Sequence, residues 1–292
     1  MGARSSDVTF GTILRLGRVS NLPTVWTNAL AGAVLAETIA PSGDFAASTL
    51  LAALALTLFY EGGMWLNDAF DAEIDARERA NRPIPMGEIS KSAVFFGGWL
   101  LLAAGVAVAF LAGTAAGYAA IGLAVAVVLY DWLHKRTALS PVIMGATRFL
   151  SYAVAACAVG VFGDAAMLGA LGLFAWIVGL TYAAKQEAYD RIGAAWPLAT
   201  LAAPIVYLLW LGLSEPATWA FCAALIGVAA FALHRLFRRA PGDVPRAVVT
   251  MIAGVSLYDA ALIASTGAVS LALLAAAGFV LTLFLQRVAS GT

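Results

Sequence analysis

The chain has 292 residues, of which 62% are hydrophobic and 12% are charged, and its 17 basic and 17 acidic side chains balance. Soluble domains carry about 25% charged residues, so the composition excludes an ordinary soluble protein and indicates an integral membrane protein. The net charge of zero gives no reason to expect a nucleic-acid partner.

Apolar segments of about 20 residues, the length that crosses a bilayer as a helix, follow one another along the chain. In chain order they cover 21–40, 46–66, 93–112, 115–133, 141–162, 166–184, 197–213, 216–234, 246–265 and 267–286. Only the sequence STGA separates the last two, so nine helices are the alternative to ten. The segments predict a single all-α domain over residues 1–292, a polytopic bundle of nine or ten transmembrane helices.

The basic residues fall on one side of this predicted bundle. With the N-terminus in the cytoplasm, every lysine and arginine except Arg148 lies in the N-terminal segment, a cytoplasmic loop or the C-terminal tail. The opposite loops, which read APSGDF, AGTAAG, FGDA, LSEP and STGA, contain none. Cytoplasmic loops of membrane proteins carry an excess of lysine and arginine. The pattern predicts a multi-pass protein with a cytoplasmic N-terminus, in the inner membrane of a bacterial cell.

Arg148 lies inside the fifth apolar segment, in the sequence PVIMGATRFLSY. A charged side chain within a membrane helix is costly and usually faces a polar cavity or a partner. The alternative is an interfacial arginine whose head reaches the membrane surface. We favour a functional position for Arg148.

The sequence NDAFDAEIDARERANRPIPMG directly follows the second apolar segment. Continuing the helix through it places Asp68, Asp71 and Asp75 on one face, with Asn67 beside them, because the spacings are three and four residues. Grouped carboxylates repel one another unless a cation neutralises them, and Mg²⁺ takes oxygen ligands of this kind. A solvated acidic helix end is the alternative, but the arginines and prolines that follow argue against it.

Two further polar clusters lie at the cytoplasmic ends of later helices. YDWLHKRTALSP contains Lys135 and Arg136, which are either positive-inside anchors or ligands of a pyrophosphate near the metal. TYAAKQEAYDR contains Lys185, with Glu187 and Asp190 on one helical face, and is a weak signal by itself. Carboxylates for a metal, cations for phosphate and a wide apolar bundle together favour a lipid pyrophosphate as ligand.

The acidic sequence quoted above closely resembles the first aspartate-rich motif of the UbiA superfamily of intramembrane prenyltransferases, NDxxDxxxD followed by RPxxxG. YDWLHK resembles the tyrosine-to-lysine motif of that family through Tyr130 and Lys135, and LRLGRVSNLPTVWTNALAG resembles its first helix through Arg18 and Asn21. Within the superfamily, the run GRVSNLPTVWTNALAG is most similar to the EboC-like branch. The resemblance covers roughly residues 14–200.

The resemblance implies a helical bundle around a central cavity that opens sideways to lipid. It also implies Mg²⁺-dependent transfer of an isoprenyl group from its pyrophosphate, through an allylic carbocation, to a small lipophilic acceptor, which we expect to be aromatic. The metal ligands would be Asn67, Asp68, Asp71, Asp75, Glu187 and Asp190. Catalytic roles fall to Asp68, Asp71, Lys135 and Arg148, and substrate binding to Arg18, Asn21, Arg82, Tyr130, Arg136 and Lys185.

The chain departs from the family at the second motif, which usually reads DxxxD. Here KQEAYD places Gln186 and Asp190 at that spacing, with Glu187 as a substitute, so the second metal is open. A tenth helix would also depart from the usual nine. One alternative function is a non-catalytic or repurposed binder of lipid pyrophosphates, or a transport-associated protein. Another is an ion-coupled transporter, although its sites are expected near the bilayer midplane rather than at helix ends.

Overall fold

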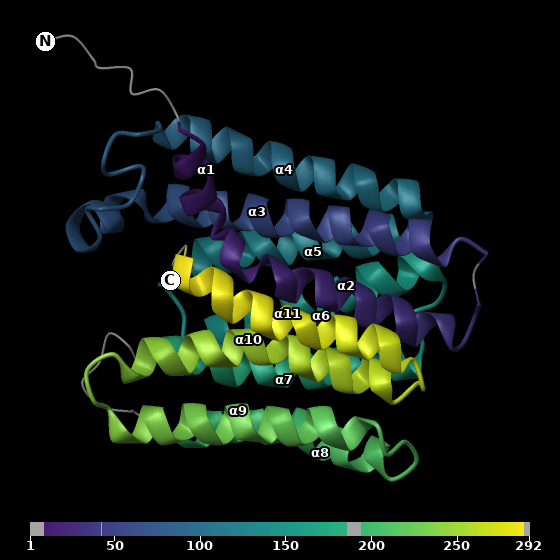
Figure 1. The fold of residues 1–292 in the computed structure, drawn as a ribbon. Coiled ribbons are helices and arrows are strands. Elements are labelled where there is room, and N and C mark those ends of the chain that lie inside the picture. Colours follow the sequence, from purple (N-terminus) through teal and green to yellow (C-terminus); the bar gives the residue numbers. More distant parts are fainter. Residues whose placement is uncertain (1–8, 42, 186–193, 289–292) are drawn as a thin grey trace, which may run out of the picture.

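The computed structural model describes residues 9–41, 43–185 and 194–288, which form helices joined by short connections. The helices are α1 (Phe10–Gly17), η1 (Val19–Asn21), α2 (Leu22–Glu37), α3 (Phe45–Glu78), α4 (Lys91–Ala112), α5 (Thr114–Leu133), α6 (Ser140–Val159), α7 (Asp164–Lys185), η3 (Trp196–Leu201), α8 (Ala202–Gly212), α9 (Thr218–Arg238), α10 (Asp243–Ala264) and α11 (Val269–Val288). The long helices run side by side, with α3 and α4 along one edge of the bundle and α8 and α9 along the other (Figure 1).

The predicted all-α, multi-pass membrane architecture is confirmed, because each of the ten apolar segments forms a helix. Eight of the described helices are long and apolar enough to cross a membrane. Helix α2, with 16 residues, and the apolar run Trp196–Gly212 are shorter. The predicted number of nine or ten spans is therefore approximate.

Local sequence explains where several helices begin and end. Pro23 and Pro141 lie in the first turns of α2 and α6, where proline costs no hydrogen bond because the N–H groups there have no intrahelical acceptor. The Ser90 side chain accepts a hydrogen bond from the Ala93 N–H and caps α4. Helix α3 has no such interruption, so it continues 34 residues and carries the acidic motif beyond the apolar part.

Helix α1 is an element that the apolar segments did not predict. The Thr9 side chain caps it, and it ends at Arg18, whose φ of 44° is left-handed. One face buries Leu16 against α3, whereas Phe10 on the opposite face is exposed. A helix of eight residues is too short to give a membrane-length signal, so hydrophobicity alone did not reveal it.

The core consists of two large apolar clusters that meet at the pair α2 and α6. Val25 of α2 and Val154 of α6 belong to the cluster that includes α3, α4 and α5. Leu35 and Tyr152 belong to the cluster that includes α7, α9 and α10. The two helices approach closely at Gly32, where a Cβ would lie 3.0 Å from the Tyr152 carbonyl oxygen. The pair α2 and α6 therefore connects both halves of the bundle.

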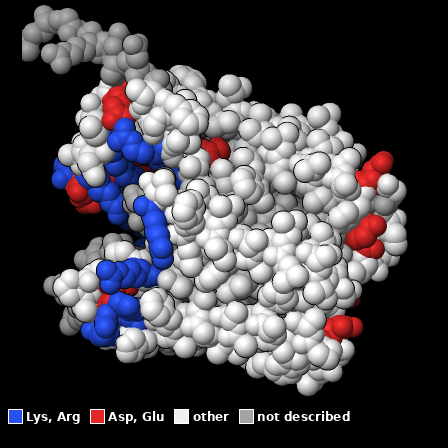
Figure 2. All heavy atoms as spheres, in the orientation of Figure 1, with Lys and Arg blue, Asp and Glu red and all other residues white. Residues whose placement is uncertain are grey.

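Charged side chains divide between the two ends of the bundle. Figure 2 shows lysine and arginine gathered at one end, where α3 ends and α10 begins, and separate acidic patches at the other end. This distribution agrees with the loop pattern of the sequence. Which end faces the cytoplasm stays a prediction.

Candidate active site

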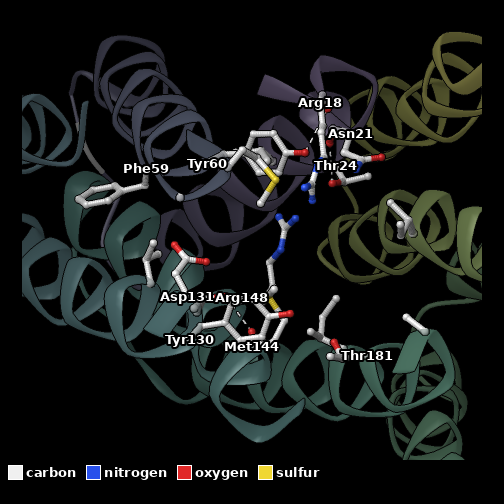
Figure 3. Close-up of a pocket in the computed structure, with 18 of the residues that line it drawn as sticks. Arg18, Asn21, Thr24, Phe59, Tyr60, Tyr130, Asp131, Met144, Arg148 and Thr181 are labelled. Atoms are coloured by element: carbon white, nitrogen blue, oxygen red, sulfur yellow. Dashed lines mark hydrogen bonds between the residues drawn. The ribbon is translucent and has the colours of Figure 1, made fainter. Parts of the chain in front are cut away.

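A cavity of about 660 Å³ opens at the basic end of the bundle. Its wall is formed by α1, α2, α3, α5, α6, α7 and α10 together with residues 79–83, and it combines charged, polar and apolar side chains. Figure 3 shows Arg18 and Asn21 on one side of the cavity and Tyr130, Asp131 and Arg148 on the opposite side. A central cavity is thus present, and its sideways opening to lipid stays a prediction.

The acidic motif lies at the mouth of this cavity, on the last turns of α3. The side chains of Asn67, Asp68, Asp71 and Asp75 are all buried. Asp68 lines the cavity itself and accepts hydrogen bonds from Arg18 at 2.9 Å and Arg82 at 2.5 Å.

Arg82 also attaches the loop after α3 to the side of that helix. Its guanidinium lies 3.2 Å from Asp75 Oδ2, so one arginine neutralises two of the motif carboxylates. Burial lowers the pKa of Arg82 from its ordinary value, whereas Asp68 and Asp75 act in the opposite direction. The arginine of RPIPMG therefore belongs to the same cluster as the aspartates that precede it in the sequence.

The tyrosine-to-lysine segment reaches the acidic motif from α5. Lys135 Nζ lies 2.9 Å from Asp71 Oδ2, and His134 Nε2 lies 3.2 Å from the same oxygen. Tyr130 stacks on His134 with ring centroids 5.3 Å apart. The structure therefore brings the first two sequence clusters together, and adds His134, which the sequence analysis left out.

Asp131 is a second residue that the sequence analysis missed. It is 3% exposed, its Oδ1 accepts a 3.2 Å hydrogen bond from the Asn67 amide, and its Oδ2 has no hydrogen-bond partner among the described residues. It lines the cavity next to Tyr130 (Figure 3). The sequence did contain a signal for Asp131, because this carboxylate directly follows the motif tyrosine in YDWLHK.

The third cluster contributes less to the described site. Lys185 donates hydrogen bonds to the carbonyl oxygens of His134 and Thr137 and to the Ser140 hydroxyl, so it holds the connection between α5 and α6. Arg136 lies over the Trp132 ring. Neither residue lines the cavity, and the geometry gives no support to their predicted substrate-binding role. Gln186, Glu187 and Asp190 lie outside the described residues.

The donors at the mouth fit a hard divalent cation in their chemistry. They are carboxylate and amide oxygens, which Mg²⁺ prefers, and the buried Asp131 Oδ2 is unpartnered. Within the described ranges, however, no three histidine, cysteine or acidic residues are close enough to hold a metal together. The motif aspartates instead pair with basic side chains. Mg²⁺ would therefore need further oxygen ligands from a substrate, as it commonly takes them from phosphates.

Further inside the cavity, Arg148 belongs to a polar network across three helices. Its Nη1 donates to Asn28 Oδ1 at 2.9 Å, and Asn28 Nδ2 donates to Asp259 Oδ2 at 2.8 Å. The Tyr152 hydroxyl donates to the other Asp259 oxygen. The sequence analysis did not single out Asn28 or Asp259, although an acidic residue inside the apolar segment 246–265 is itself a functional signal.

Asn21 and Arg18 are held where the chain enters α2. The Gln286 amide of α11 donates to Asn21 Oδ1, and the Tyr60 hydroxyl donates to the Arg18 carbonyl oxygen at 3.1 Å. Both residues line the cavity, and their substrate-binding role stays a prediction.

The fold and site define a multi-pass helical membrane protein with an acidic motif and basic side chains at the mouth of an internal cavity. The UbiA prenyltransferase family model matches residues 25–255, so the chain belongs to this family. The predicted membership is confirmed, whereas the EboC-like branch stays a prediction.

Named relatives and solved structures agree with this family. The chain is 35% identical over 132 residues to digeranylgeranylglyceryl phosphate synthase from Methanococcoides burtonii, which is 43% of this chain and 47% of the relative. Across eight curated relatives that it matches, the chain spans from 23% to 57% of their length.

The solved structures show the fold. The apo structure of a UbiA homologue from Aeropyrum pernix superposes with a TM-score of 0.64 at 19% identity, covering 84% of this chain and 96% of that one. A UbiA homologue from Archaeoglobus fulgidus bound to GPP and Mg²⁺ gives a TM-score of 0.57 at 12% identity, covering 89% of this chain and 99% of that one.

Proposed function

We propose that this protein is a prenyltransferase that moves an isoprenyl group from its pyrophosphate to a lipophilic acceptor in the membrane. The observation that carries the proposal is the cluster that the acidic motif forms with Arg18, Arg82 and Lys135. Asp68, Arg18 and Arg82 of this cluster line a cavity that also has many apolar side chains. A polar end suits a pyrophosphate head, and an apolar interior suits an isoprenyl chain. Membership of the UbiA family supports the same reaction.

Mg²⁺ is the proposed cofactor, held by Asn67, Asp68, Asp71 and Asp75. A UbiA homologue of similar fold is bound to GPP and Mg²⁺. When bound, Mg²⁺ would supply positive charge against the pyrophosphate oxygens and make pyrophosphate a better leaving group. Participation of Glu187 and Asp190 in a second metal site stays a proposal from the sequence alone.

The basic side chains at the mouth would bind the pyrophosphate directly. Arg18, Arg82 and Lys135 now donate to motif carboxylates, and the same donors suit phosphate oxygens. As the bond between carbon and oxygen breaks, its electron pair leaves with the pyrophosphate, and fixed positive charge at that position stabilises the transition state. The allylic cation that remains would lie near Tyr60 and Tyr130, whose aromatic rings attract cations.

The acceptor is the less defined half of the reaction. The family resemblance of the sequence implied an aromatic acceptor, whereas the named relatives are synthases of digeranylgeranylglyceryl phosphate, a product built on glycerol phosphate. We propose a lipophilic acceptor whose nucleophilic atom attacks the allylic carbon. The positive-inside pattern further supports a cytoplasmic position for the acidic motif, and the bacterial inner membrane stays a prediction.

The test is transfer of label from radioactive geranyl pyrophosphate into lipid, with purified protein in vesicles and extracted membrane lipid as the acceptor pool. We expect transfer that requires Mg²⁺ and that falls at least about 100-fold in Asp71→Asn, because a carboxylate proposed to hold Mg²⁺ against the leaving pyrophosphate is removed. Asp44→Asn is the matched control, since Asp44 is exposed at the opposite end of the bundle.

Three results would count against the proposal. Unchanged transfer in Asp71→Asn would remove the role of the acidic motif. Binding of Mg²⁺ and geranyl pyrophosphate with no transfer to any lipid would favour the repurposed binder, which the departure at KQEAYD also suggests. Binding that needs neither Mg²⁺ nor pyrophosphate would favour the transporter.

A further inference from the structure

One wall of the cavity follows helix α3 away from the acidic motif. The α3 residues that line it are Asp68, Met64, Gly63, Tyr60, Phe59 and Leu56. Their spacings of one, three and four residues place them on one helix face. From Asp68 to Leu56 this face extends over twelve residues, or about 18 Å along a helix that rises about 1.5 Å per residue. An isoprenyl chain attached to a pyrophosphate at the motif can therefore lie along α3.

Helix α5 lines the cavity beside α3. Its lining residues begin with Asp131 and Tyr130, next to the motif, and continue through Val127 to Leu123. A Cβ at Gly63 would lie 3.0 Å from Val127 Cγ1, so the two helices lie close together at this level. On both helices the lining begins with a carboxylate and ends with apolar side chains. That order suits the head and the chain of an isoprenyl pyrophosphate.

Phe59 lies at the apolar end of this lining. Leu56, Phe59 and Leu123 are each 2% exposed, and they belong to one apolar cluster that includes residues of α2, α3, α4, α5 and α6. Figure 3 shows Phe59 on the side of the cavity away from Arg18 and Thr181. Because side chains that line the cavity here have almost no exposed surface, this end of the cavity is enclosed. The ring of Phe59 is the largest of the three side chains that an isoprenyl chain would meet there.

The ring of Phe59 packs against a glycine of α4. A Cβ at Gly105 would lie 3.1 Å from Phe59 Cε2 and 3.2 Å from Phe59 Cδ2, closer than the separation of about 3.5–4.0 Å that carbon atoms prefer. Helix α4 is held against α3 two turns away, where a Cβ at Gly62 would lie 3.0 Å from the Gly98 carbonyl oxygen. Gly105 therefore leaves room for the ring, and a side chain there would displace the ring toward the cavity.

We infer that Phe59 limits the length of the isoprenyl chain that the cavity accepts, and that Gly105 determines the position of the Phe59 ring. This inference rests on the proposed prenyl transfer. A chain longer than the limit would need the space that the ring occupies, and close-packed interiors resist the addition of even one methylene group. Phe59 lies away from the acidic motif along α3, so it is a specificity residue and takes no part in the chemistry.

The experiment compares geranyl, farnesyl and geranylgeranyl S-thiolodiphosphate, analogues that resist cleavage. Purified full-length protein in one detergent is titrated with each analogue by calorimetry, with and without Mg²⁺. We expect the affinity of the wild type to stop rising within this series, at the chain whose end reaches Phe59. For each variant, the affinity is divided by that of the wild type for the same analogue, because this ratio cancels the partition of each chain into detergent.

Two variants should change the length limit in opposite directions. Phe59→Leu should raise the ratio by about tenfold or more for the first analogue beyond the wild-type limit, since one methylene group in an apolar pocket changes binding by about that much. Gly105→Ala should lower the ratio for the longest analogue that the wild type accepts, because the ring moves into the cavity. The double variant should lose this effect of Gly105→Ala, because it has no ring to displace.

Phe149→Leu is the matched control for the loss of a ring. Phe149 is partly buried, packs against Phe162 with ring centroids 5.5 Å apart and does not line the cavity. Its substitution should leave the ratios independent of chain length. The apparent melting temperature of each variant checks that it is folded.

Ratios that do not depend on chain length in Phe59→Leu would overturn the inference, as would the same length dependence in Phe149→Leu. A wild-type affinity that keeps rising through geranylgeranyl S-thiolodiphosphate would also overturn it, since the chain would then end elsewhere. An equal effect of Gly105→Ala with and without the Phe59 ring would remove the role of Gly105. Failure of the proposed function gives a different result, because then no analogue of any length would show Mg²⁺-dependent binding.

Discussion

At the scale of single residues, each aspartate of the acidic motif has a basic partner. Asp68, Asp71 and Asp75 occupy two turns of α3 and are buried, where like charges repel strongly. Arg82 neutralises the first and third of them and Lys135 the second. Mg²⁺ bound to these carboxylates would leave the same ammonium and guanidinium groups available to a pyrophosphate.

Asp131 gives a prediction at this scale. We expect Asp131→Asn, which keeps the side-chain shape, to weaken Mn²⁺ binding in the presence of geranyl S-thiolodiphosphate by about tenfold, the low end of the effect of changing a group that supports a metal ligand. The reason is that Asp131 holds Asn67 and carries an unpartnered oxygen. Electron paramagnetic resonance of Mn²⁺ measures the affinity without requiring turnover. Asp164→Asn, in the first turn of α7 at the opposite end, is the control, and equal affinity in both variants would contradict the prediction.

At the scale of helices, the packing of α2 against α6 affects both the core and the cavity. It joins the two apolar clusters, and it brings Asn28 next to Arg148. The close contact between the two helices is possible because Gly32, one turn beyond Asn28 on α2, has no side chain. Packing and site geometry are therefore coupled in this pair.

We predict that Gly32→Ala moves α2 away from α6. The added Cβ would lie 2.9 Å from the Ala155 Cβ and 3.0 Å from the Tyr152 carbonyl oxygen, and backbone cannot move aside cheaply. Such overpacking costs about 1–3 kcal/mol. The expected result is a lower apparent melting temperature in detergent. Gly227→Ala is the matched control, because nothing lies within 4 Å of a Cβ there, and equal melting temperatures would show that the helices tolerate the methyl group.

A second prediction concerns the attachment of α1 to the loop after α3. Arg15 and Thr12 of α1 donate to Glu88, and these hydrogen bonds lower the pKa of Glu88 below its ordinary value of 4.5. Because the folded pKa is below the unfolded one, the attachment stabilises α1 above about pH 4.5 and is lost as the pH falls through the folded pKa. A nitroxide on Gly11→Cys, in a variant without native cysteines, should become mobile in that range.

Glu88→Gln separates this contact from other effects of acid. In that variant the nitroxide on α1 should already be mobile at neutral pH and change little on acidification. A label on Ser270→Cys, which is exposed on α11, is the control for general unfolding. Identical mobility curves with and without Glu88→Gln would contradict the role of Glu88.

At the scale of the whole molecule, the division of charge predicts its orientation. Basic side chains surround the cavity mouth and are absent from the loops that join the other helix ends (Figure 2). Since cytoplasmic loops carry the excess of lysine and arginine, the mouth should face the cytoplasm. Substrates with a pyrophosphate head would then enter from that side.

Cysteine labelling tests this orientation in intact cells. In a variant without native cysteines, Ser214→Cys should react with a membrane-impermeant maleimide from outside, whereas Glu78→Cys should react only after lysis. Both positions are exposed and lie at opposite ends of the bundle, so each serves as the control of the other. The reverse pattern of labelling would reverse the topology.

The fold could be predicted well from the sequence because membrane helices are long, continuous apolar segments. The ten apolar segments, the continuation of α3 into the acidic motif and the division of charge all follow from local composition and spacing. The same holds for Asp68, Asp71 and Asp75, since three- and four-residue spacings put side chains on one helix face wherever the helix lies. The family motif depends on that local pattern too.

Only the tertiary structure decided which distant residues meet. Asp131 contacts Asn67, and Asp259 supports Arg148 through Asn28, yet these residues lie on different helices far apart in the chain. Lys185 contacts Ser140 and Arg136 lies over the Trp132 ring, and their predicted substrate-binding role stays a prediction. Helix packing sets such contacts through close approaches like that at Gly32, and these depend on the three-dimensional arrangement rather than on any local spacing.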